Sequence, residues 1–408
     1  MIVRTIRVRT IWSVCVPLPL LSLMLVVFGL TTGEFVIAGI LPDVAAGLAV
    51  PVPAAGRLVT AYALGMIVGG PVVTALTARL PRRPLVTGLV AVSVLANLGS
   101  AVAPGYGLLL AARFAAGLVV ATFFAVAIAT AVSTAPEGRQ ASAVAKVALG
   151  MNLGIVLGTP LGTLVGQHLG WRAAFAAVAA LTAAGLLMVL RFVPASPAPT
   201  GSMRGELRVF KGRDVQLALA LTAVGNVGVV TVFSYIAPLL TGVGGFGEGA
   251  VPALLLLYGA GAVAGNFLGG RLADRALMPS LAGLLAVLAA VLVLFWAAGG
   301  VRILAVPLVF VLGLLAFAII PGMQTRVLTA AGAAPTLAVA VNASGFQTAA
   351  AFAGWLGGAV IDHGPGLRSL YLVGAALTAA GLGIALYVLR RDRRPSPEPG
   401  RRPEHAGT

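Results

Sequence analysis

The stretch GLTTGEFVIAGILPDVA, residues 29–45, places one carboxylate, Glu34, inside an apolar run. An ionised side chain at the centre of a bilayer costs about 2.5 to 3.5 kcal/mol on insertion scales, so it needs a polar cavity, a partner or a proton. The other acidic residues fall at the ends of apolar segments, between them or near the C-terminus. Glu34 is therefore the one acid expected in the membrane interior.

Arg113, in LLLAARFAAGLVVATFF, is a second deep charge. Counted from outer boundaries near Leu41 and Gly107, Glu34 and Arg113 each lie roughly 10 Å down their helices at 1.5 Å per residue. We expect the two to serve proton coupling, because a carboxylate that alternates between a proton and a cationic partner responds to solvent access. A static clamp between two helices is the alternative, and depth alone does not decide whether the side chains pair.

Polar and aromatic residues in other apolar segments are candidates for the wall of a substrate cavity. Aromatic rings among amides suit an amphipathic organic solute, although packing or lipid contact explains each residue taken singly. The candidates are Asn152, Asn226, Phe233, Ser234, Tyr235, Asn342, Phe346 and Gln347.

Membrane-spanning helices must position these residues. Of the 408 residues, 59% are hydrophobic and 9% are charged, with a mean hydropathy of +1.04, whereas a soluble domain carries roughly 25% charged residues. A spanning helix needs about 20 apolar residues, and short breaks rich in Gly, Pro and Arg separate twelve such segments. They lie near residues 18–41, 54–78, 84–103, 107–132, 140–165, 171–193, 215–240, 249–272, 278–299, 302–326, 336–360 and 367–389.

The formal charge of +16 orients the chain and does not indicate a nucleic-acid partner. With both termini in the cytoplasm, an even number of spans leaves only Arg57, Arg172, Arg302 and Arg368 in outer loops. All other loop and terminal basic residues are then cytoplasmic, which is the positive-inside rule.

A cleaved signal peptide is an alternative for the first segment, since Arg4, Arg7 and Arg9 precede it. Apolarity persists to Leu41 without a small-residue cleavage site, so we expect a retained span. The single cysteine, Cys15, excludes an intramolecular disulfide and a cysteine metal cluster.

A shift of 196 residues aligns the two halves of the chain without a gap. The matches include Pro42 with Pro238, Tyr62 with Tyr258, Gly65 with Gly261, Gly69 with Gly265, Arg79 with Arg275, Gly158 with Gly354, Gly162 with Gly358 and Arg172 with Arg368. Because each copy holds six spans, both insert in the same orientation. The prediction is an all-α membrane protein of two six-helix bundles related by a pseudo-two-fold axis along the membrane normal.

The composition divides the chain into four parts. We expect an N-terminal bundle over residues 1–193 and a cytoplasmic linker over residues 194–213, where Pro and Ser disfavour helix. A C-terminal bundle over residues 214–389 follows, and a disordered basic tail occupies residues 390–408.

Charged residues at two equivalent breaks are candidates for a cytoplasmic gate. Arg79, Arg82 and Arg83 follow the second span, and Asp274 and Arg275 follow the eighth. A carboxylate there can bridge to a helix of the other half when the inner side closes. A solvated turn is the alternative.

In GIVLGTPLGTLVGQ, residues 154–167, Gly154, Gly158 and Gly162 recur every four residues around Pro160. Small residues on one face permit a close helix contact, and the proline removes a backbone hydrogen bond. The second copy has no proline at the equivalent place, so a kink is expected in one half only.

Together these patterns resemble the major facilitator superfamily, and within it the twelve-span drug:proton antiporters that include sugar-efflux and actinobacterial chloramphenicol-resistance exporters. TTGEFVIAGILPDVA is similar to the first-span signature of that group. Arg113 and Gly117 match a fourth-span Arg-x-x-x-Gly element to which proton coupling is attributed. Gly154, Gly158, Pro160 and Gly162 match the antiporter motif of the fifth span. The family's loop motif is half present, since its acid occurs only in the second copy, as Asp274.

The resemblance implies a monomeric exporter of small organic molecules in the bacterial inner membrane. Protons drive it by alternating access without a cofactor, and chloramphenicol-like drugs are the first substrates to consider. Export of sugars or other metabolites is the nearest alternative. An intramembrane enzyme is a distant one, because it would need acids or histidines clustered at one depth, and the repeat favours a rocking carrier over a static channel.

Overall fold

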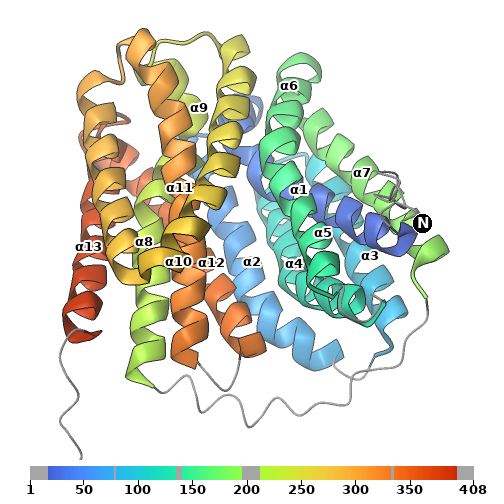
Figure 1. Ribbon diagram of the computed structural model, residues 1–408. Helices are drawn as coiled ribbons and strands as arrows, with labels where there is room; N and C mark the ends of the chain where they lie inside the picture. The colour runs from blue at the N-terminus through green and yellow to red at the C-terminus, as the bar shows by residue number, and fades with distance from the viewer. Residues whose placement is uncertain (1–16, 78–79, 135–139, 195–211, 332–334, 393–408) are drawn as a thin grey trace, which may run out of the picture.

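The computed structural model describes residues 17–77, 80–134, 140–194, 212–331 and 335–392. Within these ranges every regular element is a helix (Figure 1). Helices suit so apolar a chain because their backbone polar groups bond within the element, as the interior of a bilayer requires. The expected all-α membrane fold is confirmed.

The first half of the chain forms six spans, and the fifth of these consists of three consecutive pieces. The elements are α1 (Leu18–Gly47), α2 (Val52–Thr77), α3 (Arg82–Ala101), α4 (Tyr106–Thr134), then α5 (Gln140–Leu153), η1 (Gly154–Gly158) and α6 (Thr159–Leu169), and α7 (Trp171–Phe192).

The second half repeats this order from α8 onward. Its elements are α8 (Arg213–Ser234), α9 (Ile236–Pro238), η3 (Leu239–Val243), η4 (Glu248–Ala250), α10 (Val251–Ala298), α11 (Arg302–Ala331), α12 (Pro335–His363) and α13 (Ser369–Asp392). The 48 residues of α10 bend at Ala276, where φ is −158° and ψ is 84°. This helix therefore contains the eighth and ninth predicted spans.

The predicted number of spans agrees with the helices. Ten described segments are long and apolar enough to cross a membrane. One of these, α10, covers two predicted spans, and α12 covers the eleventh. All twelve predicted spans are therefore helical.

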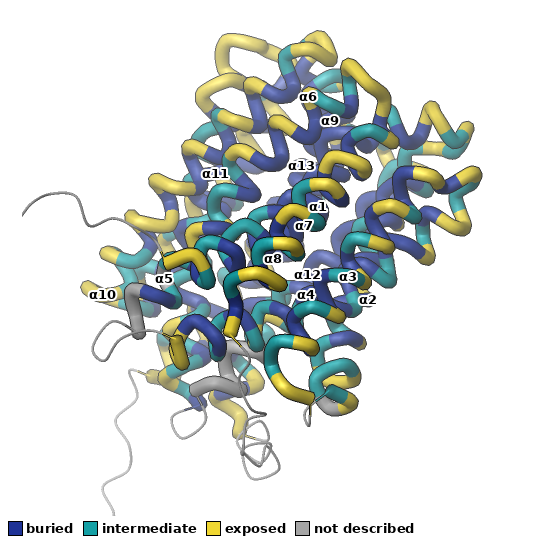
Figure 2. Tube along the Cα trace, turned by 90° about the vertical axis from the view of Figure 1, so that its right-hand side faces the viewer, coloured by how far each residue is buried: buried dark blue, intermediate teal, exposed yellow. Residues whose placement is uncertain are grey.

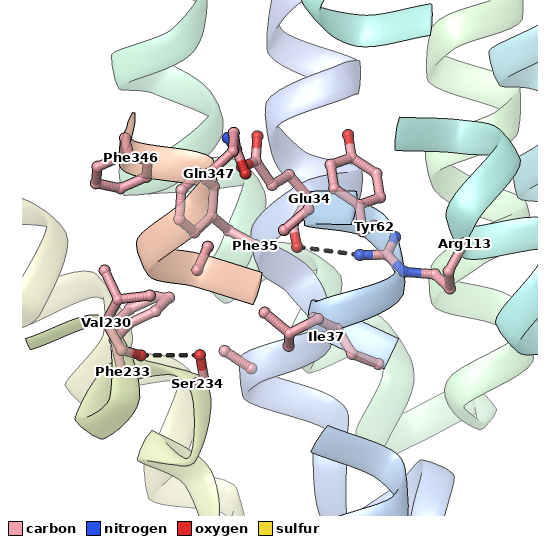
Figure 3. Close-up of a pocket in the computed structure, with 14 residues that line it drawn as sticks. Glu34, Phe35, Ile37, Tyr62, Arg113, Val230, Phe233, Ser234, Phe346 and Gln347 are labelled. Atoms are coloured by element: carbon pink, nitrogen blue, oxygen red, sulfur yellow. Dashed lines mark hydrogen bonds between the residues drawn. The ribbon is translucent and has the colours of Figure 1, made fainter. Parts of the chain in front are cut away.

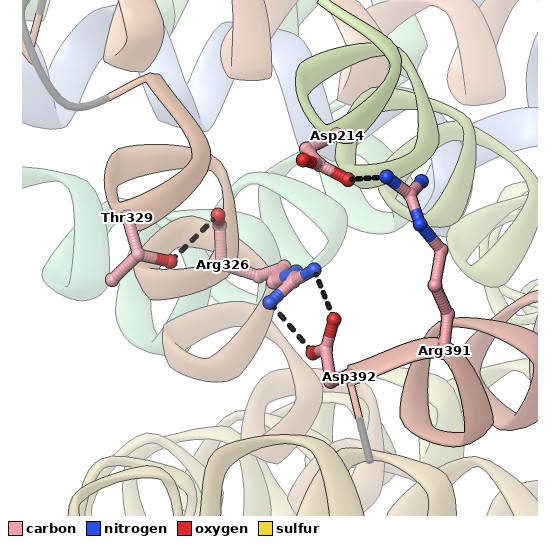
Figure 4. Close-up of polar contacts among 5 residues, drawn as sticks. All are labelled: Asp214, Arg326, Thr329, Arg391 and Asp392. Atoms are coloured by element: carbon pink, nitrogen blue, oxygen red, sulfur yellow. Dashed lines mark hydrogen bonds and ion pairs between the residues drawn. The ribbon is translucent and has the colours of Figure 1, made fainter. Parts of the chain in front are cut away.

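Several ends differ from the expected boundaries. Helix α1 continues past Pro42 to Gly47, so Asp43 lies on its last turns instead of beyond them. Helix α13 continues to Asp392, three residues into the segment expected to be a disordered tail. Ion pairs explain that extension, because Arg326 binds Asp392 at 2.9 Å and Arg391 binds Asp214 at 3.0 Å (Figure 4). The rest of the tail, most of the linker and residues 1–16 lie outside the described residues.

The duplicated glycines join equivalent helices in the two halves. A Cβ on Gly65 of α2 would collide with the backbone of α4 at Phe114. A Cβ on Gly261 of α10 would collide with the backbone of α11 at Phe310. Adding 196 to the numbers of Gly65 and Phe114 gives Gly261 and Phe310. The sequence repeat is therefore also a repeat of helix contacts.

Two ends of the bundle are distinguished by charge. The basic end is the one at which α3 and α8 begin, α7, α11 and α13 end, and α10 bends. The arginines of these ends are Arg82, Arg83, Arg191, Arg213, Arg275, Arg326 and Arg391. We call the opposite one the far end. Figure 2 shows the buried segments along the middle of the bundle and the exposed ones toward its rims.

The two halves touch mainly between the middle of the bundle and the far end. Thr60 of α2 donates to the Ala351 carbonyl of α12 at 2.8 Å, and Gln167 of α6 donates to the Glu248 carbonyl at 2.7 Å. The described polar contacts of the arginines at the basic end stay within one half. Among the described residues the contacts between the halves therefore gather toward the far end, and we call this conformation parted at the basic end.

Candidate transport site

A cavity lies between the halves at the depth of Glu34 (Figure 3). It contains about 420 Å³ of space not occupied by atoms, part of it open to solvent. Its lining comes from α1, α2 and α4 of the first half and from α8 and α12 of the second. The lining residues are Glu34, Phe35, Ile37, Ala38, Val59, Tyr62, Ala63, Arg113, Val230, Phe233, Ser234, Phe346, Gln347 and Ala350.

The carboxylate of Glu34 bonds across the interface between the halves. Nε2 of Gln347, on α12, donates to Oε1 of Glu34 at 3.0 Å. Gln347 is 6% exposed, and its own Oε1 has no hydrogen-bond partner within the described structure. An acid of the first half and an amide of the second thus form a polar contact between the halves.

Arg113 is fully buried and binds the backbone of α1. Its Nη1 donates to the Gly33 carbonyl at 2.7 Å, and its Nη2 donates to the Glu34 carbonyl at 3.3 Å. The guanidinium also lies 4.4 Å from the ring centroid of Tyr62 and 5.7 Å from that of Phe175. Cation–π contact and charge-assisted bonds together stabilise a cation that burial alone would disfavour.

The structure bears on whether Glu34 and Arg113 pair. In this conformation the arginine holds the α1 backbone next to Glu34, and the carboxylate turns to Gln347 instead (Figure 3). The bond of Arg113 to the Glu34 carbonyl places both residues at one level of the bundle, and the two opposite charges still attract one another. That attraction offsets part of the cost of burying the carboxylate.

Aromatic rings cross the cavity from one half to the other. Phe35 of α1 meets Phe233 of α8 edge to face, with centroids 5.8 Å apart. Phe233 then contacts Tyr258 of α10 at 4.8 Å, and Tyr258 contacts Phe317 of α11 at 6.4 Å. These rings give the site a large apolar surface beside one carboxylate.

The fifth-span glycines bring that span onto α1 next to Glu34. A Cβ on Gly154, Gly158 or Gly162 would collide with Thr31, Thr32 or Val36 of α1, respectively. Ahead of Pro160 the backbone widens into the π-helical turn η1, in which the Thr159 N–H bonds to the Gly154 carbonyl. The predicted close contact is present, and the predicted kink takes the form of this turn.

Four of the eight predicted cavity residues line the cavity: Phe233, Ser234, Phe346 and Gln347. The other four lie elsewhere. Tyr235 donates to the Gly354 carbonyl at 2.7 Å, and Asn226 donates to the Thr222 carbonyl at 2.7 Å. Asn342 accepts from the Thr222 hydroxyl at 2.7 Å, and Asn152 is a half-buried residue of α5 outside the lining.

Two lining residues that the candidate set omitted are Phe35 and Tyr62. Phe35 directly follows the acid in sequence. Tyr62 is an aromatic residue that recurs in the second copy as Tyr258. Adjacency to the acid and retention of a scarce aromatic in both copies are therefore the two features of the sequence that point to these residues.

The candidate gate is not assembled in this conformation. Arg82 donates to Ser133 at 2.7 Å, and Arg83 donates to the Leu190 carbonyl, so both stay within the first half. Asp274 and Arg275 are exposed beside the α10 bend, and Arg79 lies outside the described residues. If these residues join the halves only when the basic end closes, they are expected to be apart in this structure. Their role as a cytoplasmic gate stays a prediction.

Several known proteins are similar to this chain. A chloramphenicol resistance protein of Streptomyces lividans is 36% identical, over 89% of this chain and 95% of that protein. The inner membrane transport protein YdhP of Escherichia coli K12 is 35% identical, over 92% of this chain and 97% of that protein.

A solved structure and a family model agree with these relatives. The inward-facing, unoccupied crystal structure of a bacterial homologue of the human lysosomal transporter Spinster matches with a TM-score of 0.72 at 17% identity, over 93% of this chain and 98% of that one. At 17% identity this match is evidence for the fold alone. The family model matches residues 23–336. The chain therefore belongs to the Major Facilitator Superfamily and is a multi-span membrane transporter.

Proposed function

We propose that this protein exports small organic molecules in exchange for protons. The observation that carries the proposal is the position of Glu34, a carboxylate that lines the cavity between the halves and bonds across it to Gln347. A carboxylate at this place can hold a proton or interact with a solute. Exchange requires that the two occupants compete for one site, and Glu34 offers such a site.

Arg113 supports this role from behind the acid. Its guanidinium stays protonated, and two backbone carbonyls of α1 hold it in place. The positive charge makes an empty, ionised carboxylate tolerable after the proton has left. We therefore assign the gain and loss of the proton to Glu34 and the fixed charge to Arg113.

The lining favours uncharged amphipathic aromatic solutes, with chloramphenicol-like drugs as the first class to test. Phe35, Phe233 and Phe346 supply apolar surface, and the charge of Glu34 already has its counterpart in Arg113. A sugar needs many hydrogen-bonding groups, whereas the Ser234 hydroxyl already donates to the Val230 carbonyl at 2.8 Å. Sugar export is accordingly the second candidate.

A single chain in the bacterial inner membrane, with both termini in the cytoplasm, would perform the cycle without a cofactor. A proton that falls through 100 mV supplies about 2.3 kcal/mol, enough for a roughly fifty-fold gradient of a neutral solute at one-for-one exchange. The basic end would then be the cytoplasmic entrance. The cavity would alternate between the two ends as the halves rock about the residues that join them.

Drug-sensitivity assays in an efflux-deficient bacterial host test the proposal. Expression of the protein should raise the tolerated concentration of chloramphenicol-like drugs, and an uncoupler should remove the protection. The Glu34→Gln variant, expressed at the same level, should give no protection. Protection by Glu34→Gln equal to that of the unaltered protein would overturn the assignment of Glu34, and protection against none of a drug panel would favour metabolite or sugar export.

A further inference from the structure

We propose that the Gln347–Glu34 contact is a proton-sensitive clasp that holds the empty transporter open at its basic end. The inference rests on the proposed function and assigns to Gln347 a positioning role in it. The contact joins α12 of the second half to α1 of the first at the depth of the cavity. Nothing about the residue type alone suggests this role, because glutamine does not titrate.

The clasp is distinguished by its acceptor. Three hydrogen bonds between described residues join the halves. Those of Thr60 and Gln167 end on backbone carbonyls, which keep the same charge at any physiological pH. The bond of Gln347 ends on the carboxylate of Glu34. Of these three bonds it is the one whose strength changes when its acceptor gains or loses a proton.

The sign follows from hydrogen-bond chemistry. An ionised carboxylate accepts a charge-assisted bond from the amide, which is roughly twice as strong as a bond to a neutral acceptor. Proton loss from Glu34 therefore strengthens the clasp, and protonation weakens it. Because the clasp is made in the conformation that is parted at the basic end, proton release favours that conformation.

No other titratable group of the cavity duplicates this link. Among the described residues packed around α1, Tyr62 of α2 and Arg113 of α4 are the titratable or charged side chains that share the cavity with Glu34. Both belong to the first half, as Glu34 does. The lining residues of α8 and α12 include no titratable side chain, so the second half senses the acid through Gln347.

A clasp of this kind would prevent futile proton leak. If the empty, deprotonated carrier could turn back to the far side, it would collect another proton and return without exporting anything. The clasp keeps that form waiting at the basic end. A solute with a hydroxyl or amide N–H releases it by donating to Glu34 in place of Gln347, while the buried Gln347 Oε1 that lacks a partner becomes an acceptor for the solute.

The test measures the separation of the halves at the basic end by double electron–electron resonance in lipid nanodiscs. Spin labels are placed at Leu80 and Thr325, two exposed residues of the first and second halves, in a Cys15→Ser background. Distances are recorded at acidic and alkaline pH without substrate. The unaltered protein should shift toward the open basic end at alkaline pH, and the ratio of open to closed forms should change on the order of tenfold.

Two variants make the test specific. Gln347→Leu keeps the side-chain volume in an apolar lining and removes the donor, so the pH response should nearly vanish. Thr60→Val removes an inter-half bond to a backbone carbonyl, so it should shift the balance by the same factor at both pH values and leave the pH response intact. Proteoliposomes containing Gln347→Leu should also leak protons faster without substrate than those containing Thr60→Val.

The outcomes separate this proposal from the proposed function. An unchanged pH response in Gln347→Leu, with no added proton leak, would overturn the clasp and leave proton-coupled export standing. A flat response in the unaltered protein would overturn the clasp, and drug export by Glu34→Gln equal to that of the unaltered protein would overturn the proposed function as well. A lost pH response in Gln347→Leu together with an intact one in Thr60→Val would establish the clasp.

Discussion

The two halves of this transporter share their scaffold and differ in their chemistry. Gly117 of α4 approaches the Tyr62 carbonyl, and 196 positions later Gly313 of α11 approaches the Tyr258 carbonyl. The two charged residues of the cavity are not repeated. Val230 occupies the position equivalent to Glu34, and Val309 the position equivalent to Arg113.

The two halves thus keep the same helix contacts and differ in the side chains that line the cavity. The duplicated glycines join helices within one half, α2 to α4 and α10 to α11, so the same scaffold is built twice. The proposed proton exchange needs one acid, and a second acid in the same cavity would add a further desolvation cost. Val230 itself lines the cavity opposite Glu34, so the second half contributes apolar surface and an amide at the same depth.

The largest effect is expected when the acid is moved to the other half. The double substitution Glu34→Val with Val230→Glu keeps one carboxylate in the cavity, but the equivalent of Arg113 there is Val309. Proton-coupled transport should fall to background, and the displaced acid should carry an uncompensated cost of about 2.5 to 3.5 kcal/mol. Flux assays in proteoliposomes check this, and coupled transport by the double variant would show that the halves are interchangeable.

The next effect concerns the fixed cation. Arg113→Met removes two charge-assisted bonds to α1, each contributing about 1.5 to 3 kcal/mol, and leaves Glu34 without its counter-charge. Thermal unfolding in detergent should occur at a clearly lower temperature, and transport should be lost. The matched variant Val309→Met in the second half adds volume at a fully buried position, so it should lower the unfolding temperature by a smaller amount and keep transport. Equal loss in both variants would argue for packing alone.

A smaller and symmetric effect is expected from the shared scaffold. Gly65→Ala and Gly261→Ala each force a methyl group against the backbone of a neighbouring helix. Such overpacking costs about 1 to 3 kcal/mol. Chemical denaturation should give the same loss for both within error. A large inequality between them would mean that the halves do not share one packing scheme.

The smallest effect on stability is expected at the fifth-span turn. Pro160→Leu restores a backbone N–H next to η1, and the equivalent position in the second half already holds Leu356. The free energy of unfolding should change by about 1 kcal/mol or less, while the transport rate should fall because the widened turn beside Glu34 is relaxed. Leu161→Ile, at an exposed neighbouring residue, should alter neither quantity.

Much of the fold was predictable because lipid imposes simple rules. Span length, the repeat and the glycine spacing each follow from hydropathy and steric contact, and the helices bear out all three. The ends were less predictable. Helix α13 reaches Asp392 because that carboxylate pairs with Arg326, a residue 66 positions earlier in the chain.

The site was predictable in part for a related reason. Glu34 and Arg113 stand out because charge is costly in a bilayer, whatever helix face carries it. To predict which amide side chain faces the cavity, one must know which face of its helix points inward, and hydropathy does not give that face. Asn342 and Gln347 lie five positions apart on α12, so they point to different sides, and only Gln347 reaches Glu34.

The most direct test of the central role of Glu34 is the accumulation of labelled chloramphenicol in proteoliposomes under an imposed pH gradient. The unaltered protein should accumulate the drug against its gradient and lose it when a protonophore is added. Glu34→Gln should still exchange labelled for unlabelled drug, which shows folded protein, yet should not accumulate it. Equal accumulation by Glu34→Gln, or accumulation by the unaltered protein without any proton gradient, would contradict the account.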